Sequence, residues 1–169
     1  MNTDPVILIR LKSNVFFDFS SKKINTSGST IIRHLVSDVL VASPSYKKIS
    51  IVGHTDNVGT AENNLRLSKK RSDIVVEELQ KQLRRLGDTA NGVHSFQIES
   101  IGVGESQPIE HTEREMASQA NRRLEIFLSP SSIALHKTEK YIQCLHHWDD
   151  TAPESDLADC FLEYMVIQE

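Results

Sequence analysis

Three features are missing from this 169-residue chain, and each absence narrows what the protein can be. No apolar run approaches the ~20 residues that a membrane-spanning helix needs. Residues 1–5 contain no basic segment leading into an apolar core, so no signal peptide is indicated. No basic run occurs either, and a net charge of −4 gives no reason to expect a nucleic-acid partner. The sequence therefore indicates either a cytoplasmic protein or the soluble part of a longer envelope protein.

Cysteine is scarce, with two residues in the whole chain. Both Cys144 and Cys160 lie within residues 130–169. Two interpretations stay open for them. They are either buried free thiols or a disulfide formed in an oxidising compartment.

Charge is unevenly distributed along the chain. Residues 130–169 hold eight acidic residues against two lysines, a net charge of −6. Residues 1–129 carry 15 acidic and 17 basic residues, a net charge of +2. This shift predicts a boundary near residues 129–132, with one domain over 1–129 and an acidic extension over 130–169. The first part is long enough to bury a core of its own.

Residue patterns predict alternating strands and helices. Expected strands cover residues 6–11, 14–19, 49–53, 96–101 and 123–128, and expected helices cover residues 27–41, 61–86 and, more briefly, 114–121. The order β-α-β-α-β-(α)-β predicts an α/β sandwich (α+β), with helices packed on one face of a mixed sheet. In the acidic extension, apolar segments over 133–147 and 155–167 predict a helical hairpin.

One segment places two opposite charges close together. Asp56 lies just beyond the expected strand 49–53, and Arg71 lies in the apolar stripe of the next helix, on the same face as Asn64. A charge on a packed helix face is costly unless it is paired, so Arg71 needs a partner. Asp56 and Glu78 are both candidates, and a structural ion pair is the simpler interpretation. The alternative is a recognition site, because a fixed anion and a fixed cation together suit a free amino acid.

Other candidate sites are weaker. His54 lies beside Asp56, but no nucleophile or second base is placed nearby. His146 and His147 precede two aspartates, yet adjacent histidines on a regular helix cannot both face one metal ion. We therefore expect no metal, no cofactor and no catalysis.

Several motifs occur in the order and at the spacing of one family. They are residues 15–19 (VFFDF), 53–59 (GHTDNVG), Asn64, Leu67, Ser68, Arg71, 102–104 (GVG), Pro108 and 121–123 (NRR). In these motifs, residues 6–128 resemble the OmpA C-terminal-like peptidoglycan-binding domain. That domain is shared by outer-membrane protein A, the peptidoglycan-associated lipoprotein and the flagellar stator B subunit.

The resemblance implies a ligand and the residues that hold it. Asp56 would bind the ammonium group of diaminopimelate in a peptidoglycan stem peptide, and Arg71 its carboxylate. Further positions that match the surroundings of the ligand are Thr55, Asn64, Leu67, Phe19 and Ser20. Many members have Asp or Asn where this chain has Ser20, so a side-chain contact there is in doubt.

One arginine of the 121–123 motif commonly supports the site in this family. Arg122 alternates with Leu124 on the expected last strand, whereas Arg123 alternates with Glu125. Because an apolar neighbour indicates the covered face of the sheet, this parity favours Arg122.

The function that the resemblance implies is non-catalytic. The chain would anchor an envelope protein or complex to the cell wall, and its extended start is more similar to stator-type members than to lipoproteins. We expect it in the periplasm or cell envelope, within a membrane-tethered parent protein, with a homodimer as one arrangement. One alternative is an interaction scaffold that has lost wall binding, supported by Ser20 and the acidic extension. A metal-dependent hydrolase is the least favoured alternative.

Overall fold

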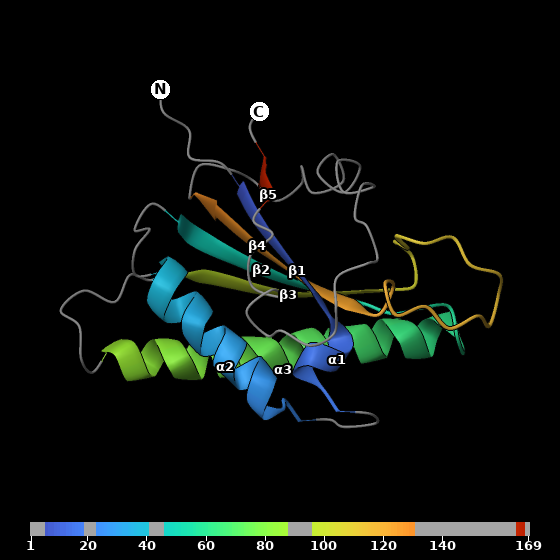
Figure 1. The fold of residues 1–169 in the computed structure, drawn as a ribbon, viewed down its shortest axis with the longest axis horizontal. Coiled ribbons are helices and arrows are strands. Elements are labelled where there is room, and N and C mark those ends of the chain that lie inside the picture. The colour runs from blue at the N-terminus through green and yellow to red at the C-terminus, as the bar shows by residue number, and fades with distance from the viewer. Residues whose placement is uncertain (1–5, 19–22, 41–45, 88–95, 131–164, 168–169) are drawn as a thin grey trace.

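The computed structural model describes residues 6–18, 23–40, 46–87, 96–130 and 165–167. The described strands form one five-stranded sheet in the order β3-β2-β4-β1-β5. The strands β2 and β3 are parallel, and the other neighbouring pairs are antiparallel. Helices lie along one face of this sheet (Figure 1). The predicted α/β sandwich with a mixed sheet is thereby confirmed.

The elements alternate as predicted from β1 to β3, whereas no helix lies between β3 and β4. The strands are β1 (Val6–Lys12), β2 (Tyr46–His54), β3 (Gln97–Gly104), β4 (Arg123–Pro130) and β5 (Met165–Ile167). The helices are α1 (Ser13–Phe16), α2 (Thr26–His34) and α3 (Ala61–Gly87), and a π-helical segment η1 (Leu35–Leu40) continues α2. Asn25 caps α2, because its side-chain oxygen accepts a hydrogen bond from the backbone N–H of Gly28 at 2.8 Å. No described helix has both the length and the apolar character needed to cross a membrane.

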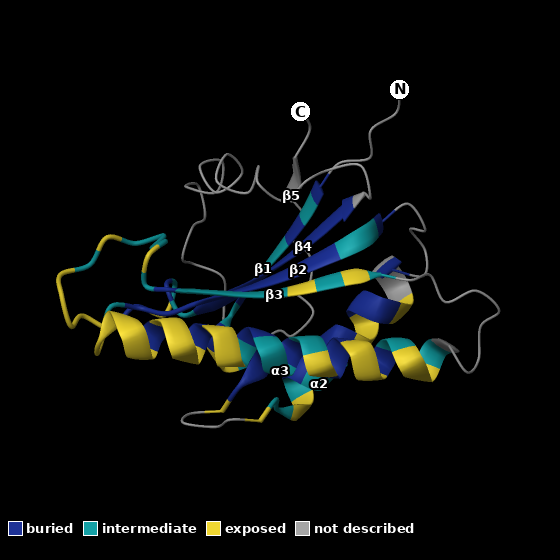
Figure 2. Ribbon diagram, turned by 180° about the vertical axis from the view of Figure 1, so that it is seen from behind, coloured by how far each residue is buried: buried dark blue, intermediate teal, exposed yellow. Residues whose placement is uncertain are grey.

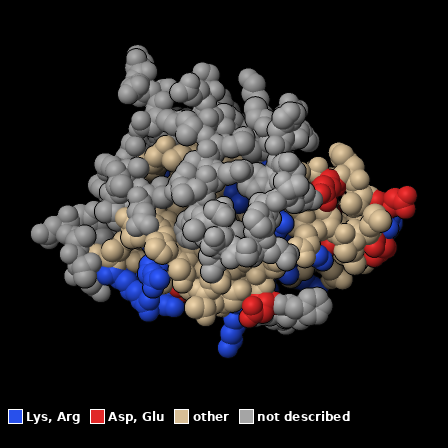
Figure 3. All heavy atoms as spheres, in the orientation of Figure 1, with Lys and Arg blue, Asp and Glu red and all other residues tan. Residues whose placement is uncertain are grey.

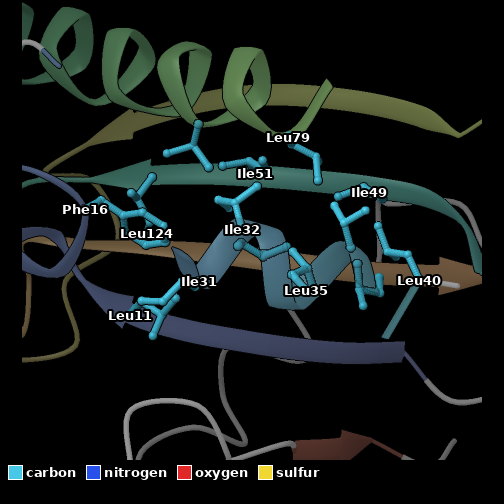
Figure 4. Close-up of a cluster of buried hydrophobic side chains, with 14 of the residues drawn as sticks. Leu11, Phe16, Ile31, Ile32, Leu35, Leu40, Ile49, Ile51, Leu79 and Leu124 are labelled. Carbon is cyan, nitrogen blue, oxygen red and sulfur yellow. The ribbon is translucent and has the colours of Figure 1, made fainter. Parts of the chain in front are cut away.

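The main core lies between the sheet and the helices. Alternate residues of β2 and β4 point toward the helices and are fully buried, namely Ile49, Ile51, Leu124, Ile126 and Leu128. Apolar side chains of α1, α2 and α3 meet them from the other side (Figure 4). Apolar residues at every second position of the strands and at about every 3.6 positions of the helices therefore pack in one shared core layer.

Two glycines bring α3 into close contact with the sheet. A Cβ atom at Gly53 would collide with the backbone carbonyl of Ser68, and one at Gly102 would collide with the backbone of Lys69. The Ser68 hydroxyl accepts a hydrogen bond from the backbone N–H of Gly104 at 2.9 Å. The first turns of α3 are thus fixed against the ends of β2 and β3.

The expected strand over residues 14–19 is wrong in its described part. Ser13–Phe16 forms one helical turn, and Phe17 makes an isolated β-bridge with Ile24. The turn starts where the backbone N–H of Ser13 donates to the carbonyl of Arg122 at 2.8 Å. Phe16 and Phe17 are both buried in the main core. Consecutive residues of a strand point to opposite faces, so a strand could not place both side chains in that one core.

Two further predictions differ from the structure. Residues 114–121 form turns instead of a helix, and Glu115 has a positive φ of 63° within them. Met165–Ile167 was expected as the end of a helix but forms β5, hydrogen-bonded to β1. The rest of the predicted helical hairpin, with Cys144 and Cys160, lies outside the described residues and stays a prediction.

Candidate functional site

Asp56 lies in the turn after β2, with only 6% of its surface exposed. Its Oδ2 atom accepts a hydrogen bond from the backbone N–H of Ser118 at 3.2 Å. The same oxygen lies 3.3 Å from Nη1 of Arg122, which forms an ion pair with it. Ser118 and Arg122, which are distant from Asp56 in the sequence, therefore hold this buried carboxylate in place.

Arg71 lies on α3, and none of the described residues forms an ion pair with it. Its guanidinium carbon is 5.7 Å from the centroid of the Phe17 ring, within cation–π range. Its Nε atom is buried without a hydrogen-bond partner, and among the described residues no carboxylate lies within 4.0 Å of its nitrogens. Burial and the nearby charge of Arg122 lower the pKa of Arg71 below its usual value, while Asp56 acts to raise it. The guanidinium is thus half-buried and close to a second cation.

Glu78 is not the partner of Arg71. One of its carboxylate oxygens accepts a hydrogen bond from Gln82 at 2.6 Å, and the other pairs with Lys81 at 3.0 Å. Of the two partners that the sequence left open, only Asp56 acts on Arg71 appreciably, and it does so through its charge without a direct ion pair.

Asn64 holds the turn after β2 from the first turns of α3. Its side-chain amide donates to the carbonyls of Asp56 at 3.2 Å and Val58 at 3.1 Å. It also donates to the carboxylate of Glu105 at 2.5 Å. The side-chain N–H groups of Asn64 therefore all donate to groups in or beside the turn and stabilise its conformation.

The remaining predicted residues are placed unequally. The backbone N–H of Thr55 donates to the carbonyl of Gly104 at 2.9 Å, and its hydroxyl is buried without a hydrogen-bond partner. Leu67 is 41% exposed, one helical turn before Arg71. Phe19 and Ser20 lie outside the described residues, so their roles stay predictions.

The reasoning that favoured Arg122 over Arg123 rested on an incorrect premise. Both faces of β4 are buried, since Leu124 is 0% exposed on the helix side and Arg123 is 1% exposed on the other. Arg122 precedes the strand, and its side chain is 38% exposed. The structure nevertheless brings Arg122 to Asp56, whereas Arg123 pairs with Glu125 at 2.9 Å.

Sequence reasoning missed the part played by residues 105–121. Besides Ser118, this loop joins the turn after β2 through Asn57, whose amide donates to the carbonyl of Glu113 at 2.8 Å. The carboxylate of Glu115 accepts from the backbone N–H of Gly59 at 3.1 Å. The loop lies on the right in Figure 1, and Figure 3 shows acidic side chains at this end of the molecule. Pro108 and Asn121 were the motif residues that pointed to this loop, and the Asn121 side-chain oxygen accepts hydrogen bonds from the backbone N–H groups of Ile109 and Glu110.

The described residues contain no group of three or more His, Cys, Asp or Glu side chains that could hold a metal ion. The imidazole of His54 is hydrogen-bonded to Glu125, with 3.1 Å between Nε2 and Oε2. It is 1% exposed. The tail residues His146 and His147 lie outside the described residues. Asp56 and Arg71 offer charges for binding. The neighbouring strands β2 and β4 are largely buried (Figure 2).

Comparison with known proteins matches residues 16–122 to the OmpA family. The chain is 31% identical over 126 residues to the probable lipoprotein YiaD of Escherichia coli (strain K12), covering 73% of this chain and 52% of that protein. It is 30% identical over 111 residues to the peptidoglycan-associated lipoprotein of Buchnera aphidicola subsp. Baizongia pistaciae, covering 66% of this chain and 58% of that protein. The alignments thus span little more than half the length of these relatives.

Solved structures show the same architecture. The periplasmic domain of MotB from Helicobacter pylori superposes with a TM-score of 0.58 at 21% identity, covering 85% of this chain and 88% of that one, which shows a shared fold alone. The peptidoglycan-associated lipoprotein from Burkholderia pseudomallei gives a TM-score of 0.50 at 26% identity, covering 68% of this chain and 88% of that one. The family match includes β2, α3 and the turn between them, which carry Asp56 and Arg71. The chain therefore belongs to the OmpA family.

Proposed function

We propose that this chain is a non-catalytic module that binds peptidoglycan by gripping the diaminopimelate of a stem peptide, and so anchors an envelope protein or complex to the cell wall. One observation carries the proposal. A buried carboxylate, Asp56, lies at the same end of the sheet as a half-buried guanidinium, Arg71, for which the described part of the chain supplies no ion-pair partner. Together with Arg122 they form what we call the candidate site.

The charges of the candidate site suit the free end of diaminopimelate. An ammonium group would bind the Asp56 carboxylate, and the neighbouring carboxylate would bind the Arg71 guanidinium. Hydrogen bonds between charged groups are shorter and stronger than neutral ones, and the planar guanidinium can bind a carboxylate through two parallel bonds. A ligand that carries both charges on one carbon therefore satisfies both side chains at once.

Arg122 adds to this preference. Two guanidinium groups face a single carboxylate in the candidate site, so one positive charge is in excess. A ligand carboxylate would neutralise that charge. The ligand ammonium would share Asp56 with Arg122, whose partly exposed side chain has room to move toward the ligand carboxylate.

The family membership supports this proposal, since one relative is named as peptidoglycan-associated. We place the chain in the periplasm or cell envelope, within a membrane-tethered parent protein. A single amino-acid end offers few contacts, so the affinity of one site is modest. Many stem peptides along one polymer, or the membrane tether itself, would raise the effective concentration and hold the parent protein in place.

The test is a calorimetric or NMR titration with meso-diaminopimelate. Asp56→Asn and Arg71→Ala should each lower the affinity at least tenfold, because each removes one of the two charges that the ligand needs. Arg84→Ala is the matched control, since Arg84 is an exposed arginine in the last turn of the same helix. It should leave the affinity unchanged.

Two measurements separate the proposal from its alternatives. If the intact chain binds neither meso-diaminopimelate nor muropeptides, the interaction scaffold is the better account. If zinc or manganese raises the thermal stability, the metal-dependent hydrolase returns as a candidate.

A further inference from the structure

A second cluster of charged side chains lies on the sheet face opposite the helices. At its centre, Oε1 of Glu125 accepts hydrogen bonds from Nε of Arg10 and Nε of Arg123, both at 2.9 Å. The other carboxylate oxygen lies 3.1 Å from Nε2 of His54. The four side chains are between 0% and 9% exposed. Glu125 thus joins β1, β2 and β4 through one buried carboxylate.

His54 acts in this cluster as a neutral donor. Burial lowers the pKa of His54 below 6.5, and this outweighs the opposite effect of Glu125. The carboxylate can only accept, so Nε2 of the imidazole carries the proton and donates it. Nδ1 is buried and has no hydrogen-bond partner among the described residues. A proton on Nδ1 would add a buried donor without an acceptor, which is costly. The charged groups facing His54 are Glu125 and Arg123 on β4 and Arg10 on β1.

The cluster and the candidate site share their sequence neighbourhoods. His54 is the last residue of β2, and Thr55 and Asp56 follow it directly. Arg123 is the first residue of β4, and Arg122 precedes it directly. The two residues that Glu125 holds together therefore flank the two residues of the Asp56–Arg122 ion pair.

We infer that Glu125 is a positioning residue for the candidate site. By holding His54 and Arg123 together, it fixes the turn that carries Asp56 relative to the strand start that carries Arg122. The two faces of β4 therefore have different roles. Leu124 and Ile126 fill the core on the helix-facing side, whereas Arg123 and Glu125 on the opposite side orient the charges of the candidate site. The effect on ligand affinity rests on the proposed function, whereas the effect on the turn does not.

The experiment compares Glu125→Gln with Phe127→Leu. Phe127 is 1% exposed, two residues further along β4 on the same face, and belongs to an apolar cluster with Leu8 and Val52. Its shortening destabilises the sheet without touching His54. Both variants are studied where each is fully folded, by amide hydrogen exchange and by titration with meso-diaminopimelate.

The amide of Thr55, which donates to Gly104, reports on the turn. Its exchange rate is taken relative to that of Ile51 in the middle of β2, so that global opening cancels. In Glu125→Gln this ratio should rise at least tenfold and the ligand affinity should fall at least fivefold. In Phe127→Leu both quantities should stay within twofold of the unaltered chain.

A second pair of variants tests the His54 link. In His54→Gln the side-chain amide nitrogen can replace Nε2 as a donor to Glu125. The Thr55 exchange ratio of this variant should therefore stay within threefold of that of the unaltered chain. His54→Leu removes the donor and should match Glu125→Gln. The inference is overturned if Glu125→Gln behaves as Phe127→Leu does, or if His54→Leu and His54→Gln are alike. If the unaltered chain does not bind the ligand but the exchange ratios change as stated, the proposed function fails while the positioning role stands.

Discussion

Arg122, rather than Arg71, forms the ion pair with Asp56, with its Nη1 3.3 Å from Oδ2. Arg71 lies over the Phe17 ring instead, and its buried Nε finds no hydrogen-bond partner in the described part of the chain. The Asp56 carboxylate therefore acts on two cations unequally, through an ion pair with Arg122 and through charge alone on Arg71. Arg71 is the group with the most to gain from an added carboxylate.

Replacing Arg122 by Gln should weaken ligand binding more than it weakens the fold. The Arg122 side chain is 38% exposed, so the loss of its ion pair should cost about 0.5–1 kcal/mol of unfolding free energy. Loss of the second cation should raise the Kd for meso-diaminopimelate about five- to tenfold, measured by titration at low and at high salt. Arg114→Gln, at an exposed arginine of the 105–121 loop, is the control. A Kd that is unchanged or improved in Arg122→Gln would show that Arg122 only competes with the ligand.

Asn64→Ala should loosen the turn after β2. The change removes donors from the carbonyls of Asp56 and Val58, and a buried acceptor left unpaired costs about 1–3 kcal/mol. Urea unfolding should show a loss of this size. The neighbouring Asn63→Ala, at an exposed position of the same helix, should lose less than half as much. Equal stability of the two variants would contradict the role assigned to Asn64.

Gly53→Ala should be more destabilising than Gly59→Ala, although only Gly59 has a positive φ, of 91°. Nothing lies within 4 Å of a Cβ atom at Gly59, so that variant pays for backbone strain alone, roughly 1 kcal/mol. At Gly53 the added methyl group meets the Ser68 carbonyl, and α3 must move off the sheet. Overpacking of this kind costs about 1–3 kcal/mol or more on top of any local effect. Urea denaturation of the two variants checks the order, and the reverse order would contradict the close contact.

Stability should fall with acid in two stages. The pKa of His54 is lowered by burial, so the unfolded chain takes up a proton first, and unfolding free energy decreases as pH falls below about 6.5. Burial raises the pKa of Glu125, but the His54 hydrogen bond and the charges of Arg123 and Arg10 outweigh it and hold the pKa well below 4.5. The Glu125 contribution is therefore present above pH 4.5 and is lost as pH falls further. Urea midpoints between pH 8 and pH 3 measure both stages.

The control for the pH prediction is His54→Gln, which cannot titrate. It should remove the first stage and keep the second. An unchanged slope between pH 7 and pH 5.5 in this variant would mean that another group is responsible.

The parts of the fold that could be predicted are those where a single period governs the chain. Leu67, Arg71 and Val75 recur at helical spacing, and the structure places all three on α3. The segment 49–53 is short, rich in β-branched residues and followed by residues typical of turns, and it lies within β2. In both cases local preference and burial favour the same conformation.

The parts that could not be predicted depend on contacts between distant segments. Ser13 turns the chain because its N–H meets the Arg122 carbonyl, and Ser118 reaches Asp56 across the 105–121 loop. Neither contact leaves a periodic trace in the sequence. On β4, charged residues at alternate positions normally indicate a solvent-facing side. Here Arg123 and Glu125 neutralise each other and are buried, so parity could not identify the covered face.

The close contact of α3 with β2 and β3, made through Gly53 and Gly102, also has a kinetic consequence. Since the helix cannot shift relative to the strands, the charges of Asp56 and Arg71 sit on a rigid frame before a ligand arrives. Binding to such a frame needs no slow rearrangement, and neither does release. Under the proposed function, each contact with peptidoglycan should therefore form quickly and break quickly, and many short-lived contacts would hold the parent protein in place.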